Sequence, residues 1–502
     1  MARNPLVWAY WETEKMSMKP MIAAALSALV LLGACSPPAG PKPEVILLHS
    51  GRMRGNVYPL SLQNISPLQH YQFLSGYVRG VREEAAKSGA KVFLIDLGDS
   101  LGGSFASHVT QSRNMVAFFN ATGYDAVMLS NLDADVPPDA IKALECKVLS
   151  PFLGPDGEPA VPGTMTGAEW DLGGLPVYLL ANFYGETDPA SAPGRFPEQF
   201  GPHAGGVVPV RDYPAILKAL GDRSSGALTL LAWMKFEPTE RAPEEFLRML
   251  RQNRIDAILA HRIYGSNERE AWQASGFVDW TPPVSLNILR NNAGFVLARM
   301  DMARVNGIWT VLRHELVPMT ANAAPADEQV VSAIEGFAGA IRAADAPLGE
   351  LPTAAEPERI LAIYMGALAS VPGTDAVAYS VDSIRSDWPA GPLRASTVFN
   401  SLPWTSGLFR ITLDRSRLGE LGAVGNLRIA VAPAGDGAVS DQVRVTTSRF
   451  FASLIARSLD LPTTAVEALP ERSEFDFFVE YLKREPDALT AATLSGWQTL
   501  EN

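Results

Sequence analysis

The sequence predicts an α/β protein with two domains, and three observations support this fold class. The 502 residues are 47% hydrophobic and 19% charged, which is typical of a globular chain long enough for two or three domains. Short apolar runs alternate with stretches of helical periodicity between residues 45 and 305, as in a two-sheet α/β sandwich. A compositional break at residues 321–326 then separates this region from a second one that starts near Leu348.

The first predicted elements form a β-α-β unit. Residues 45–48 and 91–97 are apolar runs, and each predicts a buried strand. Between them, residues 68–88 carry apolar side chains at helical spacing, and Gly89 stands where that helix is expected to end. Helical spacing returns after the compositional break, at residues 327–344, which predicts one spacer helix between the two domains.

The N-terminal region resembles the signal sequence of a bacterial lipoprotein. Residues 21–33 form an apolar run that is too short to span a bilayer but suits a signal-peptide core. This run leads into Leu32-Gly33-Ala34-Cys35, which resembles a lipobox. We therefore expect residues 1–35 to be the signal peptide, Cys35 to be lipidated and residues 36–43 to be a tether. An ordinary secretory signal with a chance cysteine is the alternative.

Charge and cysteine content narrow the function classes. The formal net charge is −12 and no basic stripe is present, so nucleic acid is not an expected partner. Cys146 is the only cysteine besides Cys35. A lipidated chain therefore cannot form an intrachain disulfide or a cysteine-based metal site.

Four apolar runs end in polar loops, at residues 45–56, 92–102, 125–135 and 256–265, and all but the third contain glycine. In α/β folds such loops meet at the carboxyl edge of the sheet, where sites are built. Their order resembles the metal-site loops of the 5′-nucleotidase family, within the calcineurin-like metallophosphoesterases. The similar frame includes Gly98-Asp99, residues 119–126 (FNATGYDA) and residues 180–182 (LAN).

The C-terminal region is similar to the second domain of the same family. The matching segments are residues 379–385 (YSVDSIR), 390–393 (AGPL) and 402–408 (LPWTSGL). The resemblance implies an α/β chain with a four-layer α/β/β/α metallophosphoesterase-like sandwich and a 5′-nucleotidase C-terminal-like α/β domain. Its implied parts are the sandwich at residues 44–320, a linker helix at 321–347, the second domain at 348–470 and a helical tail at 471–502.

The resemblance also implies that most metal ligands are replaced. Only Asp99 and Asn131 survive among the family's ligands. The other ligand positions hold Arg52, Arg54, Trp233, Arg262 and Tyr264, while Leu132 and Asp133 replace the catalytic His and Glu. A one-residue shift of the last loop would instead put His261 at its first His.

Two interpretations of the arginines remain open. In the favoured one, Arg52, Arg54 and Arg262 pair with Asp99 and Asp133 in a salt-bridge network that fills the vacated metal site. In the other, the guanidinium groups hold a phosphate or another anion without metal. By family analogy, a nucleotide-like ligand would use three further positions, Arg385, Trp404 and Phe409.

The favoured function is a non-catalytic binding or scaffold protein of the bacterial cell envelope, without a cofactor. It would contact the membrane through Cys35, facing the periplasm or the exterior, and would bind an anionic or nucleotide-like small ligand or a protein partner. The alternative is a phosphoesterase or 5′-nucleotidase that acts on periplasmic nucleotides and holds two divalent metal ions in an atypical site.

Overall fold

The structure is a computed structural model, and it describes most of the chain after residue 39. Cys35 with the signal peptide, Asn131, Leu132 and Tyr264 lie outside the described residues, as does the side chain of Arg262. The described residues are 40–62, 70–130, 133, 136–154, 156–182, 208–209, 218, 226–234, 248, 250–263, 277–278, 282–289, 296–424, 426–433, 440–490 and 497–500.

The first sheet contains the predicted opening β-α-β unit. Its strand order is β14-β13-β1-β2-β3-β4. The strands are β1 (Val45–Ser50), β2 (Lys91–Asp96), β3 (Ala126–Met128), β4 (Lys147–Leu149), β13 (Val296–Val305) and β14 (Ile308–Pro318). Strand β1 is buried along its whole length, pairing in parallel with β2 and antiparallel with β13. The parallel pairing brings the loops after β1 and β2 to the same edge.

A second sheet packs against the first. Its order is β11-β12-β10-β9-β7-β6. The strands are β6 (Gly167–Asp171), β7 (Pro176–Asn182), β9 (Leu228–Met234), β10 (Ala257–Ile263), β11 (Phe277–Val278) and β12 (Val284–Leu289). Strands β5 (Phe152–Leu153) and β8 (Val208–Pro209) form a separate pair. Side chains from both sheets form one core, which includes Leu47, Phe93, Leu179, Leu230 and Leu259.

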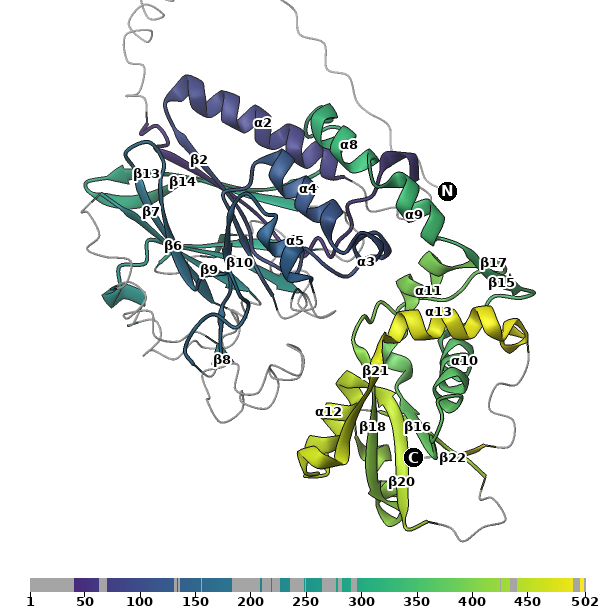
Figure 1. Ribbon diagram of the computed structural model, residues 1–502. Helices are drawn as coiled ribbons and strands as arrows, with labels where there is room; N and C mark the ends of the chain where they lie inside the picture. The colour runs from purple at the N-terminus through teal and green to yellow at the C-terminus, as the bar shows by residue number, and fades with distance from the viewer. Residues whose placement is uncertain are drawn as a thin grey trace, which may run out of the picture. The chain divides into compact units, whose positions relative to one another are not determined.

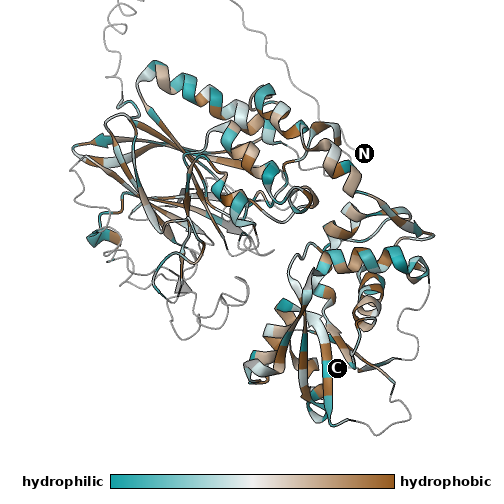
Figure 2. Ribbon diagram, in the orientation of Figure 1, coloured by the Kyte–Doolittle hydropathy of each residue, from teal (hydrophilic) through white to brown (hydrophobic). Residues whose placement is uncertain are grey.

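Helices cover the other face of the first sheet (Figure 1). These helices and the shorter ones near them are α2 (Tyr71–Ser88), α3 (Phe105–Thr110), α4 (Arg113–Thr122) and α5 (Pro138–Lys142). Helix α2 ends at Gly89, which adopts φ 80° and donates its N–H to the carbonyl of Ala85, so the predicted stop is present. Figure 2 shows hydrophobic residues along the strands and hydrophilic residues on α2. The helical layer expected outside the second sheet falls largely outside the described residues.

The predicted spacer helix is two helices, α8 (Glu328–Glu335) and α9 (Ala338–Ala344). Helix α8 begins at Asp327, whose side chain accepts the N–H of Gln329, and it ends at Gly336. Glycine is a poor helix former, so a break at this residue divides the apolar pattern that predicted one helix. Residues on both helices, such as Ile334 and Ile341, are buried.

The C-terminal region forms a third six-stranded sheet, in the order β21-β18-β20-β16-β19-β22. The strands are β16 (Ala376–Tyr379), β18 (Gly407–Asp414), β19 (Arg428–Val431), β20 (Gln442–Ser448), β21 (Val466–Ser473) and β22 (Gln498–Leu500), beside the pair β15 (Pro347–Leu351) and β17 (Gly391–Arg394). The helices are α10 (Pro357–Ala369), α11 (Ala395–Ser401), α12 (Arg449–Ser458) and α13 (Glu474–Arg484). Short 3-10 helices are η1 (Leu60–Leu62), η4 (Val381–Ser383), η5 (Arg415–Ala423), η6 (Thr463–Ala465) and η7 (Pro486–Leu489).

The C-terminal tail, residues 471–502, was predicted to be helical, and the structure shows it to be helical only in part. After α13 and η7 it returns to the sheet, where β22 pairs antiparallel with β19. No sheet of the described residues contains strands from both sides of residues 321–347. One apolar cluster nevertheless joins Tyr58 and Phe105 to C-terminal residues such as Phe399. The α/β fold class is confirmed, and the domain boundaries remain a prediction.

Candidate functional site

The loops after β1 and β2 hold three residues in the left-handed region of backbone space. Arg52, Arg54 and Asp99 have φ of 53°, 48° and 56°. Side chains with a Cβ adopt this conformation at a cost, and they keep it when the surroundings enforce it. Here the loops bond to each other: Arg52 N–H donates to Gly98 O at 2.8 Å, and Arg54 N–H to Asp99 O at 3.0 Å.

Asp99 is the centre of this loop cluster. Its Oδ2 accepts from Arg52 Nε at 2.9 Å and from Arg54 Nε at 3.4 Å. The side chains of Asp99 and Arg52 are only 3% and 9% exposed, whereas that of Arg54 is 31% exposed. Burial lowers the pKa of Arg52 to about 10 in spite of the adjacent carboxylate. Arg52 therefore remains charged at neutral pH. Asp99 Oδ2 thus accepts hydrogen bonds from two positively charged guanidinium groups.

Asp133 has a different role from the predicted one. It accepts no hydrogen bond from Arg52 or Arg54, which both bond to Asp99. Its carboxylate instead accepts backbone N–H groups of Asp99, Ser130, Leu101 and Gly102, at 2.9, 2.8, 2.9 and 3.4 Å. Burial raises the pKa of Asp133 to about 6. The residue thus fixes the second loop, because its short side chain can accept from several nearby N–H groups.

The remaining predicted positions lie on the second sheet or outside the described residues. Trp233 is buried on β9, and Arg262 belongs to β10 by its backbone. His261, the residue of the shifted alignment, is buried beside Gly51. A Cβ on that glycine would approach the His261 ring to 2.8 Å, so the glycine is needed for this packing.

A histidine–serine chain was missed by sequence reasoning. His49 Nε2 lies 2.8 Å from Ser285 Oγ, which in turn lies 2.8 Å from His314 Nε2. Burial lowers the pKa of His49 well below its ordinary value, with His314 and His261 acting in the same direction. His49 and Ser285 are 236 residues apart, so no local spacing could have signalled their contact.

The described residues of these loops do not fit a two-metal centre. Such a centre needs carboxylate, amide and imidazole lone pairs. Asp99 Oδ2 is engaged by two guanidinium groups, and both oxygens of Asp133 accept backbone N–H groups. Arginine offers no lone pair and remains positively charged. Within the described part of the chain, no group of three or more His, Cys, Asp or Glu residues is placed to hold a metal ion.

A pocket of about 890 Å³ opens beside the loop cluster. Arg54 and Asp99 line it, as do Arg385 and Trp404 from the C-terminal region. The Arg385 guanidinium carbon lies 4.6 Å from the centroid of the Trp404 ring. Desolvation lowers the pKa of Arg385 to about 10, and the charge of Arg54 acts in the same direction. Phe409, the third predicted ligand position, packs against the C-terminal core and does not line the pocket.

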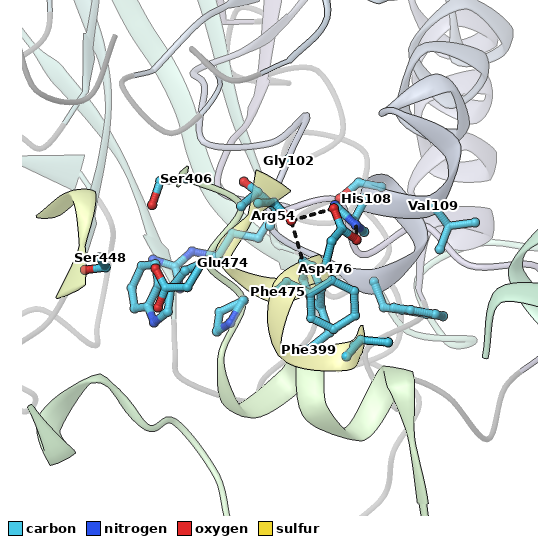
Figure 3. Close-up of a pocket in the computed structure, with 18 of the residues that line it drawn as sticks. Arg54, Gly102, His108, Val109, Phe399, Ser406, Ser448, Glu474, Phe475 and Asp476 are labelled. Carbon is cyan, nitrogen blue, oxygen red and sulfur yellow. Dashed lines mark hydrogen bonds and ion pairs between the residues drawn. The ribbon is translucent and has the colours of Figure 1, made fainter. Parts of the chain in front are cut away.

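Another wall of the pocket is made where α3 meets α13 (Figure 3). His108 Nε2 lies 3.1 Å from Asp476 Oδ1, and Phe475 packs edge-on against His108 at a centroid distance of 5.0 Å. Phe399 packs against Phe475 at 4.9 Å. The aromatic residues of the tail are mostly buried, and Phe475 also forms part of the pocket wall.

Glu474 begins α13 and also lines the pocket (Figure 3). It is 2% exposed, and burial raises its pKa to about 7. Its Oε1 accepts a hydrogen bond from the hydroxyl of Tyr379. Tyr379 is the first residue of the matched segment 379–385, but no motif in the sequence singled out Glu474.

Comparisons with known proteins find likeness in structure but not in sequence. No protein-family model and no curated protein matches the chain. A 5′-nucleotidase precursor from Thermus thermophilus is similar, with a TM-score of 0.58 and 17% identity over 88% of this chain and 96% of that one. A putative 5′-nucleotidase from Staphylococcus aureus, in complex with alpha-ketoglutarate, gives 0.63 and 13% over 91% and 99%. The sulfate thiohydrolase SoxB of the Thermus species gives 0.56 and 14% over 89% and 95%. The predicted resemblance is confirmed at the level of the fold.

Proposed function

The chain has the fold of the 5′-nucleotidases, and from this premise we propose that it is a non-catalytic, lipid-anchored member of that superfamily. Its role would be to bind a ligand or a protein partner in the cell envelope. The Staphylococcus aureus structure holds alpha-ketoglutarate, an organic dicarboxylate, and this supports an organic anion as the kind of small ligand.

The observation that carries the proposal is the shared contact of Arg52 and Arg54 with Asp99 Oδ2. A phosphoesterase of the two-metal class activates water on its cations, which lowers the pKa of the bound water toward about 7. Two guanidinium groups at ligand positions repel cations and bond to one oxygen of the Asp99 carboxylate. Without the cations, the site has no means of generating the nucleophile.

The membrane contact is proposed through Cys35. Within the described residues, no helix is long and apolar enough to cross a membrane. A diacylated and further acylated cysteine would give stable anchoring, since two or more chains bind a bilayer far more firmly than one.

Metal analysis paired with a hydrolysis assay tests the proposal. The full chain, purified in detergent, would be measured for Zn²⁺ and Mn²⁺ content and then assayed against a panel of nucleotides with each ion added. We expect less than stoichiometric metal and no turnover above background. Two metal equivalents with metal-dependent turnover would instead establish the phosphoesterase alternative.

A double variant tests whether restoring the first loop alone is enough for hydrolysis. Arg52→Asp with Arg54→His restores the family residues of the first loop only, and we expect it to remain inactive because the other replaced positions are unchanged. Activity in this double variant would show that the loop cluster retains more of the metal site than its contacts indicate.

A further inference from the structure

We infer that the tip of the β13–β14 hairpin contacts the lipid bilayer, with the exposed side chain of Ile308 at the level of the headgroups. This inference rests on the proposed function, because it requires that lipidated Cys35 hold the chain at the membrane. It goes further by assigning the face of the fold that meets the bilayer, and hence the side on which the pocket is presented.

The chain enters the described fold close to the lipid anchor. Cys35 and Glu44 are nine residues apart in the sequence, so the backbone between them can span at most about 32 Å. A compact chain of this length is about 60 Å across. A lipidated Cys35 therefore holds Glu44 and the surface around it on the side of the fold that faces the bilayer.

The β13–β14 hairpin lies directly beside this entry point. The N–H of Glu44 donates to Met302 O at 2.9 Å. The carboxylate of Glu44 in turn accepts the backbone N–H of Arg304 at 2.8 Å and the Nε–H of its guanidinium at 2.9 Å. Arg304 stands two residues before the Asn306-Gly307 turn, so these contacts fix the tip of the hairpin next to the end of the tether.

The tip presents apolar side chains on a tight turn. Asn306 and Gly307 have φ of 54° and 80°, as in the two-residue turn that matches the twist of paired strands. Val305 and Ile308 pair across this turn. Ile308 is 70% exposed, the most exposed large hydrophobic side chain among the described residues. Single exposed apolar residues are common on proteins, so it is the position beside the tether that marks Ile308 as a membrane contact.

The surroundings of Ile308 favour lipid over a protein as the occupant. The charge of Arg304 is compensated by Glu44, so the tip can approach the headgroups with its neighbouring cation paired. Trp309 holds the base of the hairpin, because its indole N–H donates to Ala227 O at 3.0 Å. An apolar side chain gains free energy in proportion to the area that it buries at the boundary of headgroups and acyl chains. The anchor keeps the bilayer at a high effective concentration beside the tip, which a soluble partner does not share.

This contact would place the pocket on the side away from the membrane. Glu44 precedes the amino end of β1, whereas Arg54 and Asp99, which line the pocket, follow the carboxyl ends of β1 and β2. The six residues of β1 separate these two edges of the sheet by about 20 Å. A ligand or partner from the periplasm or the exterior would therefore reach the pocket while the chain stays anchored.

Quenching of a fluorescent label by brominated lipid tests the inference. The lipidated Cys146→Ser chain would be reconstituted in vesicles of phosphatidylethanolamine and phosphatidylglycerol that contain phosphatidylcholine with brominated acyl chains. An environment-sensitive label is attached through Ile308→Cys or, as the matched control, through Phe450→Cys, since Phe450 is an exposed apolar residue beside the pocket. We expect quenching at position 308 to be at least about threefold stronger than at position 450. Equal quenching at the two positions would overturn the inference and leave the tip to a protein occupant.

Variants of Ile308 show whether its apolar side chain makes the contact. The label is moved to Thr310→Cys, an exposed position on the same hairpin. Ile308→Asp should reduce the quenching of this label by about half or more, because a charge is costly among acyl chains, whereas Ile308→Leu should retain it within about 20%. Equal quenching in the Ile308→Asp and Ile308→Leu chains would contradict the inference.

The outcome is separable from that of the proposed function. If Cys35 were not lipidated, the parent chain would not float with the vesicles, and its mass would show an unmodified cysteine. If only the hairpin contact were wrong, the lipidated chain would float with the vesicles, and the label at position 308 would be quenched no more than the label at position 450.

Discussion

Replacing Asp99 by Asn should destabilise the protein far more than replacing Arg52 by Met, although both changes break the same ion pair. Asn retains the shape of Asp and tolerates the positive φ at this position. Met retains the unbranched stem of Arg without its charge. The first change leaves a buried cation without its carboxylate, whereas the second removes that cation.

The size of the expected change in the free energy of unfolding follows from the burial of Arg52 and its contact with Asp99. Burial lowers the pKa of Arg52 to about 10, so the folded chain disfavours its charged form by about 3 kcal/mol even beside Asp99. Removing the carboxylate adds the loss of attraction across the 2.9 Å contact. Removing one partner of a buried pair typically costs about 3–5 kcal/mol, whereas removing both charges is often neutral or stabilising. Arg52→Met comes near the second case, because it removes the desolvated cation while Asp99 retains its contact with Arg54. We therefore expect Asp99→Asn to lose about 3–5 kcal/mol and Arg52→Met to lie within about 1 kcal/mol of the parent or above it.

Urea unfolding followed by tryptophan fluorescence measures both effects. The double variant is the control, because Asp99→Asn should cost less than half as much once Arg52 is absent. EDTA should not move the unfolding midpoint of the parent chain. An Asp99→Asn variant as stable as the parent, or an Arg52→Met variant that loses more than about 2 kcal/mol, would refute this account of the pair.

Three further predictions concern other parts of the molecule. Burial raises the pKa of Glu474 to about 7, so the folded chain retains a proton that the unfolded chain releases near 4.5. Stability should fall as the pH rises from about 4.5 to about 7, and Glu474→Gln should recover about 3 kcal/mol at pH 8 but little at pH 4, as thermal unfolding across pH would show. Phe475→Ala should cost about 3–5 kcal/mol in urea unfolding, because Phe475 is 4% exposed, while the 55% exposed Phe450→Ala should cost under about 1 kcal/mol. Mass spectrometry of the membrane fraction should find a diacylglyceryl group on Cys35, and Cys35→Ala should release the protein; an unmodified, soluble chain with its N-terminus elsewhere would contradict this.

The fold could be predicted because its signals are local. Apolar runs such as residues 45–48 are typical of buried strands when polar loops with glycine follow them, and the sequence of α2 shows its own helical periodicity and stop. The division between α8 and α9 was missed because the apolar pattern continues through Gly336. The return of the tail as β22 was missed because a strand of three residues gives no pattern.

The candidate site could be predicted only where it follows the strand ends. The resemblance of the loops predicted that Arg52, Arg54 and Asp99 share one site, and in the structure the parallel pairing of β1 and β2 brings them together. The contact of His108 with Asp476 joins residues 368 positions apart, and it depends on how α13 packs against α3. Asp133 was assigned to the arginines on charge alone, whereas in the structure nearby backbone N–H groups donate to it. Pairing by charge is a weak predictor when a carboxylate can fix its own loop.

The energetics of the loop cluster favour a binding role over a purely structural one. Three residues there retain left-handed backbone conformations, at a cost on the order of 1 kcal/mol or more each. The buried Arg52–Asp99 pair adds little stability, because desolvation of Arg52 outweighs its attraction to the carboxylate. A stable core would be reached more simply with apolar residues at these positions. What the arrangement does provide is two arginines that line the pocket, Arg54 and Arg385, of which Arg385 lies over an aromatic ring. At the loops, Arg52 and Arg54 share the one carboxylate of Asp99, so two cations there face one anion. That surplus of fixed positive charge is explained if an anionic ligand completes the site.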